Sequence, residues 1–407
     1  MLTHPFHPHR QQRRSPWLAL IFVLFLAACG GGGSDNSTPV TPPIPIPTPD
    51  NSSGRGEFKS ATLLKTLTTA ELATALAAAG ESDFVASPRY AVAAYRLNYL
   101  TIDGLGQPIE ASALMTLPQK PSGSSSPVLS YQHGTIKRDI EAPSNMNQTA
   151  SPEVILASQG YLVLSADYVG YGASKGSPHP YLLAAPSAAA VLDMLTAAAY
   201  WRQLQKVPDN QQLFLTGYSE GGYVSLAAQR ALQAGTSAHR ANLVSVAAGA
   251  GPYDVNLTFE ELLKLVRNEY PLLGALLQPG FLKYLGDSDR KNISQAILKK
   301  LLGDQADVTF MSTALDHYFD DDRAAIAAQS SVNDWLPERP LLLFHGRDDI
   351  TVSYLNTSRT LQAMQARGAG SLVTLTECNA QPSDHLDCVR PYWLWMLENF
   401  GKVAKDL

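Results

Sequence analysis

The residue with the clearest capacity for chemistry is Ser219, the central residue of a Gly-Tyr-Ser-Glu-Gly pattern at positions 217–221. An apolar run at 213–215 precedes the pattern, and a run of helical type follows it from position 222. The glycines allow the backbone to double back between a strand and a helix, which leaves the serine hydroxyl exposed on the turn. The N-terminus of the helix favours negative charge that develops beside the serine. This context predicts that Ser219 is a nucleophile, and a simple glycine turn is the structural alternative.

A serine hydroxyl is a weak nucleophile and needs a neighbouring general base. His385 is the best candidate, because it follows the last predicted strand and opens the loop that leads into the final predicted helix. His179 lies in a loop that could approach the serine, but it precedes the nucleophile in the chain. The remaining histidines beyond the N-terminal region are expected in turns, loops or helical segments away from the reaction: His133, His239, His317 and His345. A solvated loop position is the alternative for His385.

A carboxylate must hold the histidine in one tautomer. Residues 345–352 read His-Gly-Arg-Asp-Asp-Ile-Thr-Val and follow a predicted strand. They resemble the H-G-x-x-D-x-x-V segment of many α/β-hydrolases, in which the fifth residue is the acid of the catalytic triad. The resemblance implies that Asp349 has this role, with the adjacent Asp348 as the alternative. The chain order Ser219, Asp349, His385 is the order expected of this fold.

An oxyanion hole needs two backbone N–H groups that point at the developing negative charge. We expect one from Glu220, the residue after the nucleophile. The segment 131–135, Tyr-Gln-His-Gly-Thr, resembles the HG-x loop of the superfamily, which implicates the N–H of Thr135, with Gly134 as the alternative. The Asp-x-x-Gly-x-Gly pattern at 167–172 resembles the loop after the following strand in these enzymes, and we assign it a structural role.

Short apolar runs alternate with helical patterns from about residue 58 onward. Two strands around Asp103 and Gly104 predict an antiparallel hairpin within 95–118. Further strands are expected at 128–132, 161–165, 212–216, 243–247, 341–344 and 372–375, and helices at 186–204, 222–234, 354–367 and 389–400. Near-continuous apolar strands that alternate with helices predict an α/β fold, a mostly parallel sheet with helices on both faces. This is the architecture of the α/β-hydrolase fold that the motifs imply.

One segment interrupts the alternation. Residues 253–339 contain only helical patterning, which predicts a helical cap inserted between two parts of the core, 58–252 and 340–407. A second helical domain without a role at the site is the alternative. An apolar stretch at 270–277 suggests an acyl or aromatic pocket in this segment, although such a stretch is also typical of a cap interior.

The N-terminus has the features of an export signal. Three arginines and no acidic residue precede a short apolar run at 17–26, which predicts a signal peptide at 1–28. Residues 26–30, Leu-Ala-Ala-Cys-Gly, resemble the lipobox of bacterial lipoproteins, which implies that Cys29 carries a lipid anchor. A plain secretory signal is the alternative. The Gly- and Pro-rich segment 29–57 is expected to be a flexible tether, so the protein is predicted to be exported and held at a membrane.

The cysteines and the net charge indicate which covalent bonds and which classes of binding partner to expect. The chain has three cysteines, and lipidation of Cys29 leaves Cys378 and Cys388 as a disulfide in an oxidising compartment. That bond would close a loop containing His385. The net charge of −5 offers no electrostatic reason to expect nucleic-acid binding. No cluster of ligand residues suggests a metal, and the mechanism requires no cofactor.

The combined motifs resemble bacterial secretory-lipase or carboxylesterase-like proteins. The resemblance implies a serine hydrolase that cleaves a small-molecule carboxylic ester through an acyl-enzyme, with esterase and lipase activity both open. A serine peptidase of aminoacyl or prolyl type, with the same triad, is one alternative. A non-catalytic binding lipoprotein tethered to the surface is the other.

Overall fold

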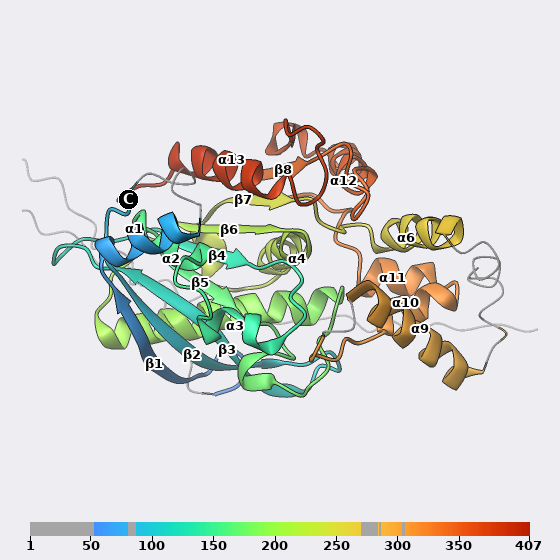
Figure 1. Ribbon diagram of the computed structural model, residues 1–407, viewed down its shortest axis with the longest axis horizontal. Coiled ribbons are helices and arrows are strands. Elements are labelled where there is room, and N and C mark those ends of the chain that lie inside the picture. Colours follow the sequence, from blue (N-terminus) through green and yellow to red (C-terminus); the bar gives the residue numbers. More distant parts are fainter. Residues whose placement is uncertain (1–52, 80–86, 270–283, 285, 303–305) are drawn as a thin grey trace, which may run out of the picture. The chain divides into compact units, whose positions relative to one another are not determined.

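The computed structural model describes residues 53–79, 87–269, 284, 286–302 and 306–407. The signal peptide expected at 1–28, the lipidation expected at Cys29 and most of the tether expected at 29–57 lie outside the described residues. The apolar stretch 270–277 lies outside them as well. The described part of the chain contains a nine-stranded sheet with helices packed on both faces (Figure 1).

The sheet has the strand order β1-β2-β3-β5-β4-β6-β7-β8-β9. Its strands are β1 (Phe58–Leu67), β2 (Val92–Ile102), β3 (Pro108–Pro118), β4 (Val128–Gln132), β5 (Leu162–Ala166), β6 (Leu213–Tyr218), β7 (Leu243–Gly249), β8 (Leu341–His345) and β9 (Val373–Glu377). Pairing is antiparallel from β1 to β5 and parallel from β5 across to β9. This topology confirms the predicted α/β-hydrolase fold.

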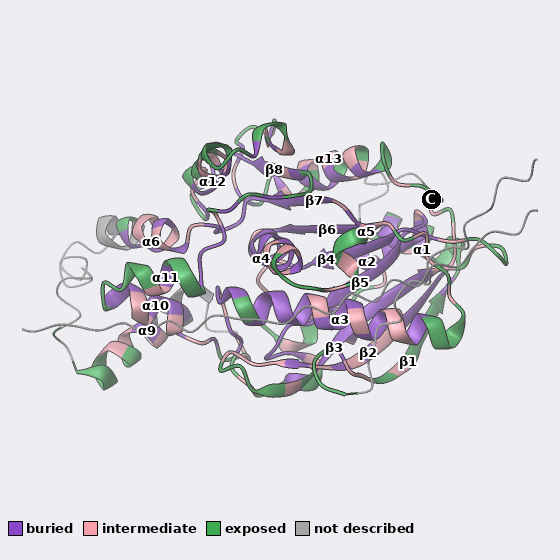
Figure 2. Cartoon of the chain, turned by 180° about the vertical axis from the view of Figure 1, so that it is seen from behind, coloured by how far each residue is buried: buried purple, intermediate pink, exposed green. Residues whose placement is uncertain are grey.

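Two apolar cores cover the two faces of the sheet. Along β6, Leu213 and Leu215 join one core and Phe214 joins the other, because side chains alternate along a strand. The first core includes α3 (Ala184–Gln205), α4 (Glu220–Ala234) and α12 (Leu355–Ala366); the second includes α1 (Thr69–Ala78), α2 (Pro152–Ser158) and α13 (Val389–Gly401). A short helix, α5 (His239–Asn242), precedes β7. Figure 2 shows the central strands buried beneath these helices.

The predicted parallel strands correspond one to one with β4 to β9, with ends that agree within two residues. The apolar runs were recognisable because these strands are buried on both faces. The antiparallel edge strand β1 was not predicted, since seven of its ten residues are exposed and its sequence lacks a buried alternating face. Its register with β2 depends on backbone pairing with a strand about 30 residues away in the chain.

The described residues in the interval between β7 and β8 form four helices. They are α6 (Val255–Glu269), α9 (Asp287–Leu302), α10 (Thr313–Phe319) and α11 (Arg323–Gln329), and Figure 1 draws them as a group beside the core. The described residues of the interval form no strand, and only Phe310 makes a single β-bridge, with His179. The N–H of Val332 donates to the carbonyl of Tyr253, so the two ends of the interval meet where they join the core.

Candidate active site

Ser219 lies on the sharp turn between β6 and α4. Its backbone has φ +59° and ψ −124°, a left-handed conformation that is costly for a residue other than glycine. Glycine at 217 and 221 makes the turn possible. A Cβ at Gly217 would collide with the carbonyl oxygen of Gly221, and one at Gly221 with that of Gln132. The flanking glycines therefore reflect close backbone approach, and the hydroxyl of Ser219 projects from the turn.

The side chains of Ser219, His385 and Asp349 form a continuous hydrogen-bonded series. His385 Nε2 lies 2.9 Å from Ser219 Oγ, and His385 Nδ1 lies 2.6 Å from Asp349 Oδ2. Because a carboxylate can only accept, Nδ1 carries the hydrogen and Nε2 is left to accept from the serine hydroxyl. His385 is 7% exposed and Asp349 is 5% exposed, whereas Ser219 is half-buried, so the series is accessible from solvent at the serine end. This arrangement can activate Ser219 for nucleophilic attack.

Asp349 is held by four hydrogen bonds. Oδ1 accepts from the N–H groups of Thr351 and Val352, each at 2.9 Å. Oδ2 accepts from His385 and also from His345 Nε2, which lies 3.1 Å away. Burial raises the pKa of this carboxyl, but the hydrogen bonds and charges of His345 and His385 together outweigh burial and lower the pKa of Asp349 to about 2. Asp349 is therefore ionised over the whole neutral range.

His345 is a member of the site that the sequence reasoning assigned to a structural turn. Its Nε2 hydrogen is shared between Asp349 and the carbonyl of Val352, at 2.8 Å, and its Nδ1 lies 2.6 Å from the hydroxyl of Thr357. The alternative acid, Asp348, turns away from His385 and accepts from the N–H and hydroxyl of Ser383.

The loop that carries His385 is fastened at several points. Cys378 and Cys388 form the disulfide expected from the cysteine count, and it closes this loop between β9 and α13. The hydroxyl of Tyr218, beside the nucleophile, donates to the carbonyl of His385 at 2.9 Å. Gly346 lies against the loop, and a Cβ there would collide with the carbonyl of Ser383. His385 is thus tied both to the turn at Ser219 and to the end of β8, which precedes Asp349.

The loop after β4 reaches the nucleophile from the other side. A Cβ built on Gly134 would lie 3.4 Å from the carbonyl oxygen of Tyr218 and 3.8 Å from Ser219 Cβ. Thr135 follows at a half-buried position, and its hydroxyl lies 3.5 Å from that of Tyr181. Glu220 begins α4, so its N–H is one of the first-turn amides that have no partner within a helix. The two expected sources of oxyanion donors therefore border the same serine.

The Asp-x-x-Gly-x-Gly loop has the structural character expected of it. The carboxylate of Asp167 accepts from the hydroxyls of Ser112 and Ser144 and from the N–H of Ser144. Gly172 has φ +56°, and a Cβ there would collide with Ser112 Oγ and the Asp167 carboxylate. None of these groups contacts Ser219 in a recorded hydrogen bond.

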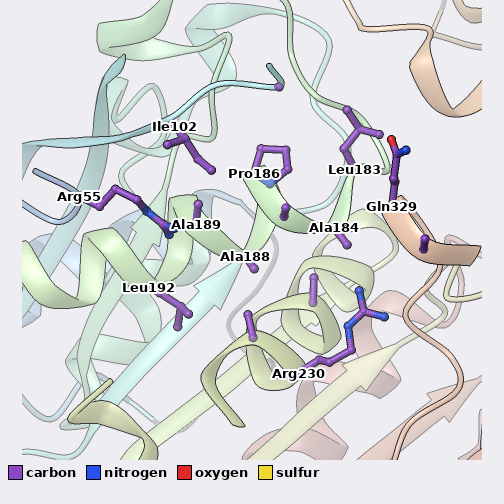
Figure 3. A pocket seen from close by; sticks show the side chains of 15 residues that line it. Arg55, Ile102, Leu183, Ala184, Pro186, Ala188, Ala189, Leu192, Arg230 and Gln329 are labelled. Atoms are coloured by element: carbon purple, nitrogen blue, oxygen red, sulfur yellow. The ribbon is translucent and has the colours of Figure 1, made fainter. Parts of the chain in front are cut away.

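Two cavities bear on where a ligand could bind. One of about 370 Å³ borders the loop after β4, and its lining includes Tyr131, Gly134, Thr135 and Glu153. A second of about 470 Å³ lies between α3 and α4 (Figure 3) and is lined mainly by alanines, with Arg55 and Arg230 on opposite sides. Ser219, His385 and Asp349 line neither cavity. The first cavity is connected to the candidate site through Gly134 and Thr135, which belong to the loop that approaches Ser219.

Within the described ranges, no three His, Cys, Asp or Glu side chains are grouped so that they could hold a metal ion. None of the described helices combines the length and the apolar character that a membrane crossing needs.

Several solved structures have the same fold, among them an esterase, a putative hydrolase and a lipase. The rice cell wall degrading esterase LipA from Xanthomonas oryzae shares 24% identity at a TM-score of 0.67, over 86% of this chain and 100% of that one. A putative hydrolase from Legionella pneumophila shares 21% identity at a TM-score of 0.68, over 85% and 97% of the two chains. Lipase A from Candida antarctica, in its closed state, shares 17% identity at a TM-score of 0.57, over 90% and 87%.

No curated protein matches the sequence. Residues 147–377, more than half of the chain, match the family model Hydrolase_4, whose description is serine aminopeptidase, S33. The matched segment contains Ser219 and Asp349 and ends shortly before His385. Together with the nine-stranded sheet and its structural neighbours, this match shows that the chain belongs to the Hydrolase_4 family and is a serine hydrolase of the α/β-hydrolase superfamily.

Proposed function

We propose that the protein hydrolyses carboxylic esters through a Ser219–His385–Asp349 catalytic triad and an acyl-enzyme intermediate. The observation that carries this proposal is the unbroken hydrogen-bonded series from Ser219 Oγ through both ring nitrogens of His385 to Asp349 Oδ2. The distances of 2.9 Å and 2.6 Å are within the range that proton transfer requires.

In the first half of the reaction, Ser219 Oγ attacks the acyl carbon while His385 Nε2 takes the hydroxyl proton. Asp349 stabilises the imidazolium that forms. The tetrahedral intermediate then collapses, and His385 donates the proton to the leaving alkoxide, which departs as the alcohol. In the second half, His385 deprotonates a water molecule that attacks the acyl-enzyme. The carboxylic acid is released and the Ser219 hydroxyl is regenerated.

The negative oxygen of each tetrahedral intermediate needs two donors, and we assign them to the N–H groups of Glu220 and Thr135. The Glu220 amide stands at the N-terminus of α4, where the helix dipole also favours negative charge. Gly134 allows the loop to approach Ser219 closely, which supports Thr135 as the residue whose N–H turns toward the oxygen. Loss of one such donor typically lowers kcat by about 10²- to 10³-fold.

A small-molecule ester is the substrate class that the surroundings favour. The cavity of about 370 Å³ beside the oxyanion loop is at the small end of the range for ligand pockets, roughly 300–1,000 Å³. Structural neighbours named esterase and lipase are compatible with this choice. The family description, serine aminopeptidase, favours a second candidate, which is cleavage of an aminoacyl amide by the same triad.

The first experiment is labelling with a fluorophosphonate probe. The wild-type protein should be labelled and Ser219→Ala should not, whereas equal labelling of both would refute the assignment of the nucleophile. A panel of nitrophenyl esters of increasing chain length is then compared with aminoacyl anilides. Preferential turnover of short esters supports an esterase, and rising turnover with chain length supports a lipase. Preferential turnover of the anilides would overturn ester hydrolysis in favour of the peptidase.

We further propose that residues 1–28 are a signal peptide, that Cys29 is lipidated and that 29–57 tether the enzyme to a membrane outside the cytoplasm. In this proposal, the core consists of 58–252 and 340–407, and 253–339 form a cap over the substrate. The test is incorporation of labelled fatty acid during expression in a bacterium, followed by fractionation. Cys29→Ser should lose the label and leave the membrane fraction, and retention of both would refute the lipid anchor.

A further inference from the structure

His179 and the side chain of Glu220 form a buried pair one residue beyond the nucleophile. His179 Nε2 lies 2.8 Å from Glu220 Oε1, and the two residues are 2% and 3% exposed. The other ring nitrogen, Nδ1, lies 2.8 Å from the carbonyl oxygen of Val169. None of these three groups takes part in the proton transfers described above. The pair is nevertheless attached to the residue whose N–H we assign to the oxyanion hole.

The hydrogen bonds of His179 define the net charge of the pair. A carbonyl oxygen can only accept, so Nδ1 must carry a hydrogen. A further proton must lie between Nε2 and Oε1, because two lone pairs would repel each other at this distance. Whether that proton resides on the imidazole or on the carboxyl, the pair as a whole is neutral. Without His179, an ionised Glu220 would be a buried, uncompensated negative charge.

Aromatic rings surround the imidazole of His179. Their centroids lie 5.2–6.1 Å from that of the imidazole, and they belong to Tyr168, Tyr171, Tyr181 and Phe310. The ring plane of Tyr168 is inclined by 19° to the imidazole, and the other three rings are inclined by 51–85°. These rings form a cage that encloses the imidazole and fixes its position against Glu220.

The three tyrosines of this cage also contact the oxyanion loop. The contacts are Tyr168 Oη to the carbonyl of His133 at 3.1 Å, Tyr171 Oη to the carbonyl of Ile136 at 2.7 Å, and Tyr181 Oη to the hydroxyl of Thr135 at 3.5 Å. His179 therefore contacts the Glu220 side of the proposed oxyanion hole directly. It is connected to the Thr135 side through the three tyrosines.

The backbone of His179 extends the same connection to the helical segment between β7 and β8. Its N–H donates to the carbonyl of Thr309 at 2.7 Å, and its carbonyl accepts from the N–H of Met311 at 2.8 Å. Phe310, between these two residues, supplies one ring of the cage. The position of His179 is therefore determined by three separate segments of the chain.

We propose that His179 is a positioning residue of the oxyanion hole, which neutralises the Glu220 carboxylate and keeps the Glu220 and Thr135 amides in register. This inference rests on the proposed function. Its physical basis is that a bare carboxylate beside the hole would oppose the negative charge of the tetrahedral intermediate in a site of low dielectric. The substrate in its ground state carries no such charge, so the effect falls on kcat rather than on KM.

The test is a charge-compensation experiment on nitrophenyl ester hydrolysis. His179→Asn keeps a donor toward Val169 but removes the contact with Glu220, and we expect kcat to fall about 10- to 100-fold with KM nearly unchanged. Adding Glu220→Gln removes the uncompensated charge, so the double variant should recover most of the lost kcat. His239→Asn is the matched control and should retain wild-type kcat, because His239 lies in α5 and its Nε2 contacts the hydroxyl of Thr196, outside the site.

A folded His179→Asn protein with wild-type kcat would overturn the inference, and so would a double variant no faster than His179→Asn. If the His179→Asn variant does not fold, the Glu220→Asp variant is tested in its place. Its shorter side chain keeps the negative charge but moves the carboxylate away from His179 Nε2. Its kcat should then be lower than that of Glu220→Gln, and the reverse order would overturn the inference. Failure of the wild-type protein to hydrolyse any ester counts against the proposed function instead, and the same comparisons are then made on the rate of fluorophosphonate labelling.

Discussion

Replacement of Asp349 by asparagine gives the sharpest test of how the candidate triad works. Oδ1 of Asp349 accepts from two backbone N–H groups, so the amide oxygen of asparagine must occupy that position. The amide NH2 then faces His385 Nδ1 in place of Oδ2. Because the amide nitrogen can only donate, Nδ1 has to accept, and the hydrogen of His385 moves to Nε2. In this tautomer Nε2 points a hydrogen at Ser219 Oγ and can no longer take its proton.

The size of the effect follows from this geometry. The asparagine variant enforces the wrong tautomer of His385 and also removes the charge that stabilises the imidazolium. A change of this kind lowers kcat by roughly 10³- to 10⁴-fold, which corresponds to about 4–5.5 kcal/mol in the activation free energy. Asp349 is 5% exposed and bonded to His385, which leaves its carboxylate little surface for a substrate to touch, so KM should change little.

The assay is steady-state hydrolysis of the best nitrophenyl ester, with Asp348→Asn as the matched control. Asp348 is exposed and bonds Ser383, so its replacement should change the activation free energy by no more than about 0.5 kcal/mol. Retention of more than a tenth of the kcat by a folded Asp349→Asn protein would refute the tautomer argument. An equal loss in both variants would refute the choice of Asp349 over its neighbour.

Three further predictions concern Asp349, the disulfide beside His385 and the loop at 167–172. The pKa of Asp349 is lowered from 3.8 to about 2 in the folded protein, so ionised Asp349 contributes about 2 kcal/mol to the free energy of unfolding. This contribution is present above pH 4 and is lost as the pH falls through 2. Urea unfolding at pH 5 and pH 2.5 should therefore show a larger loss of stability for the wild-type protein than for Asp349→Asn. The disulfide joins Cys378 and Cys388, which are separated by 10 positions in the sequence. It should contribute about 3 kcal/mol to the free energy of unfolding, because it restricts the unfolded chain. Reduction should lower esterase activity at temperatures at which circular dichroism shows the core still folded, and unchanged activity would contradict a role in holding His385. Gly172→Ala should lower the melting temperature, because its Cβ would collide with Ser112 Oγ. Gly176→Ala is the control, since Gly176 also has a positive φ, of +91°, but a Cβ there meets open space. Equal melting temperatures for the two variants would contradict the collision as the cause.

The parts of the fold that could be predicted from the sequence are those in which local pattern and burial coincide. β6 is buried throughout its length, so it appears as a continuous apolar run followed directly by the Gly-x-Ser-x-Gly turn. β1 lies at the edge of the sheet with most residues exposed, so nothing in its own sequence distinguishes it from a loop. Strand order was equally inaccessible, because the position of β5 between β3 and β4 arises from pairing between distant segments.

The same distinction applies to the site. Ser219 and Asp349 are found in short motifs, and His385 could be selected by its place after the last strand. The part played by His345 was missed because its two ring nitrogens acquire partners, Asp349 and Thr357, only when the loop after β8 folds back. A histidine that opens the same motif as the acid is a signal that could have raised this possibility.

Sheet topology explains how His179 can serve the site although it precedes the nucleophile. β6 lies in the middle of the sheet, with β4 and then β5 on one side and β7, β8 and β9 on the other. His385 follows β9 and approaches Ser219 from the second side, which is why the base comes late in the chain. His179 follows β5 and approaches the same turn from the first side, where it meets Glu220 rather than Ser219. Both ring nitrogens of His179 are occupied by Glu220 and Val169, so His385 and not His179 is the histidine that contacts Ser219. The position of His179 after β5 places it on the side of the turn where we propose the oxyanion hole.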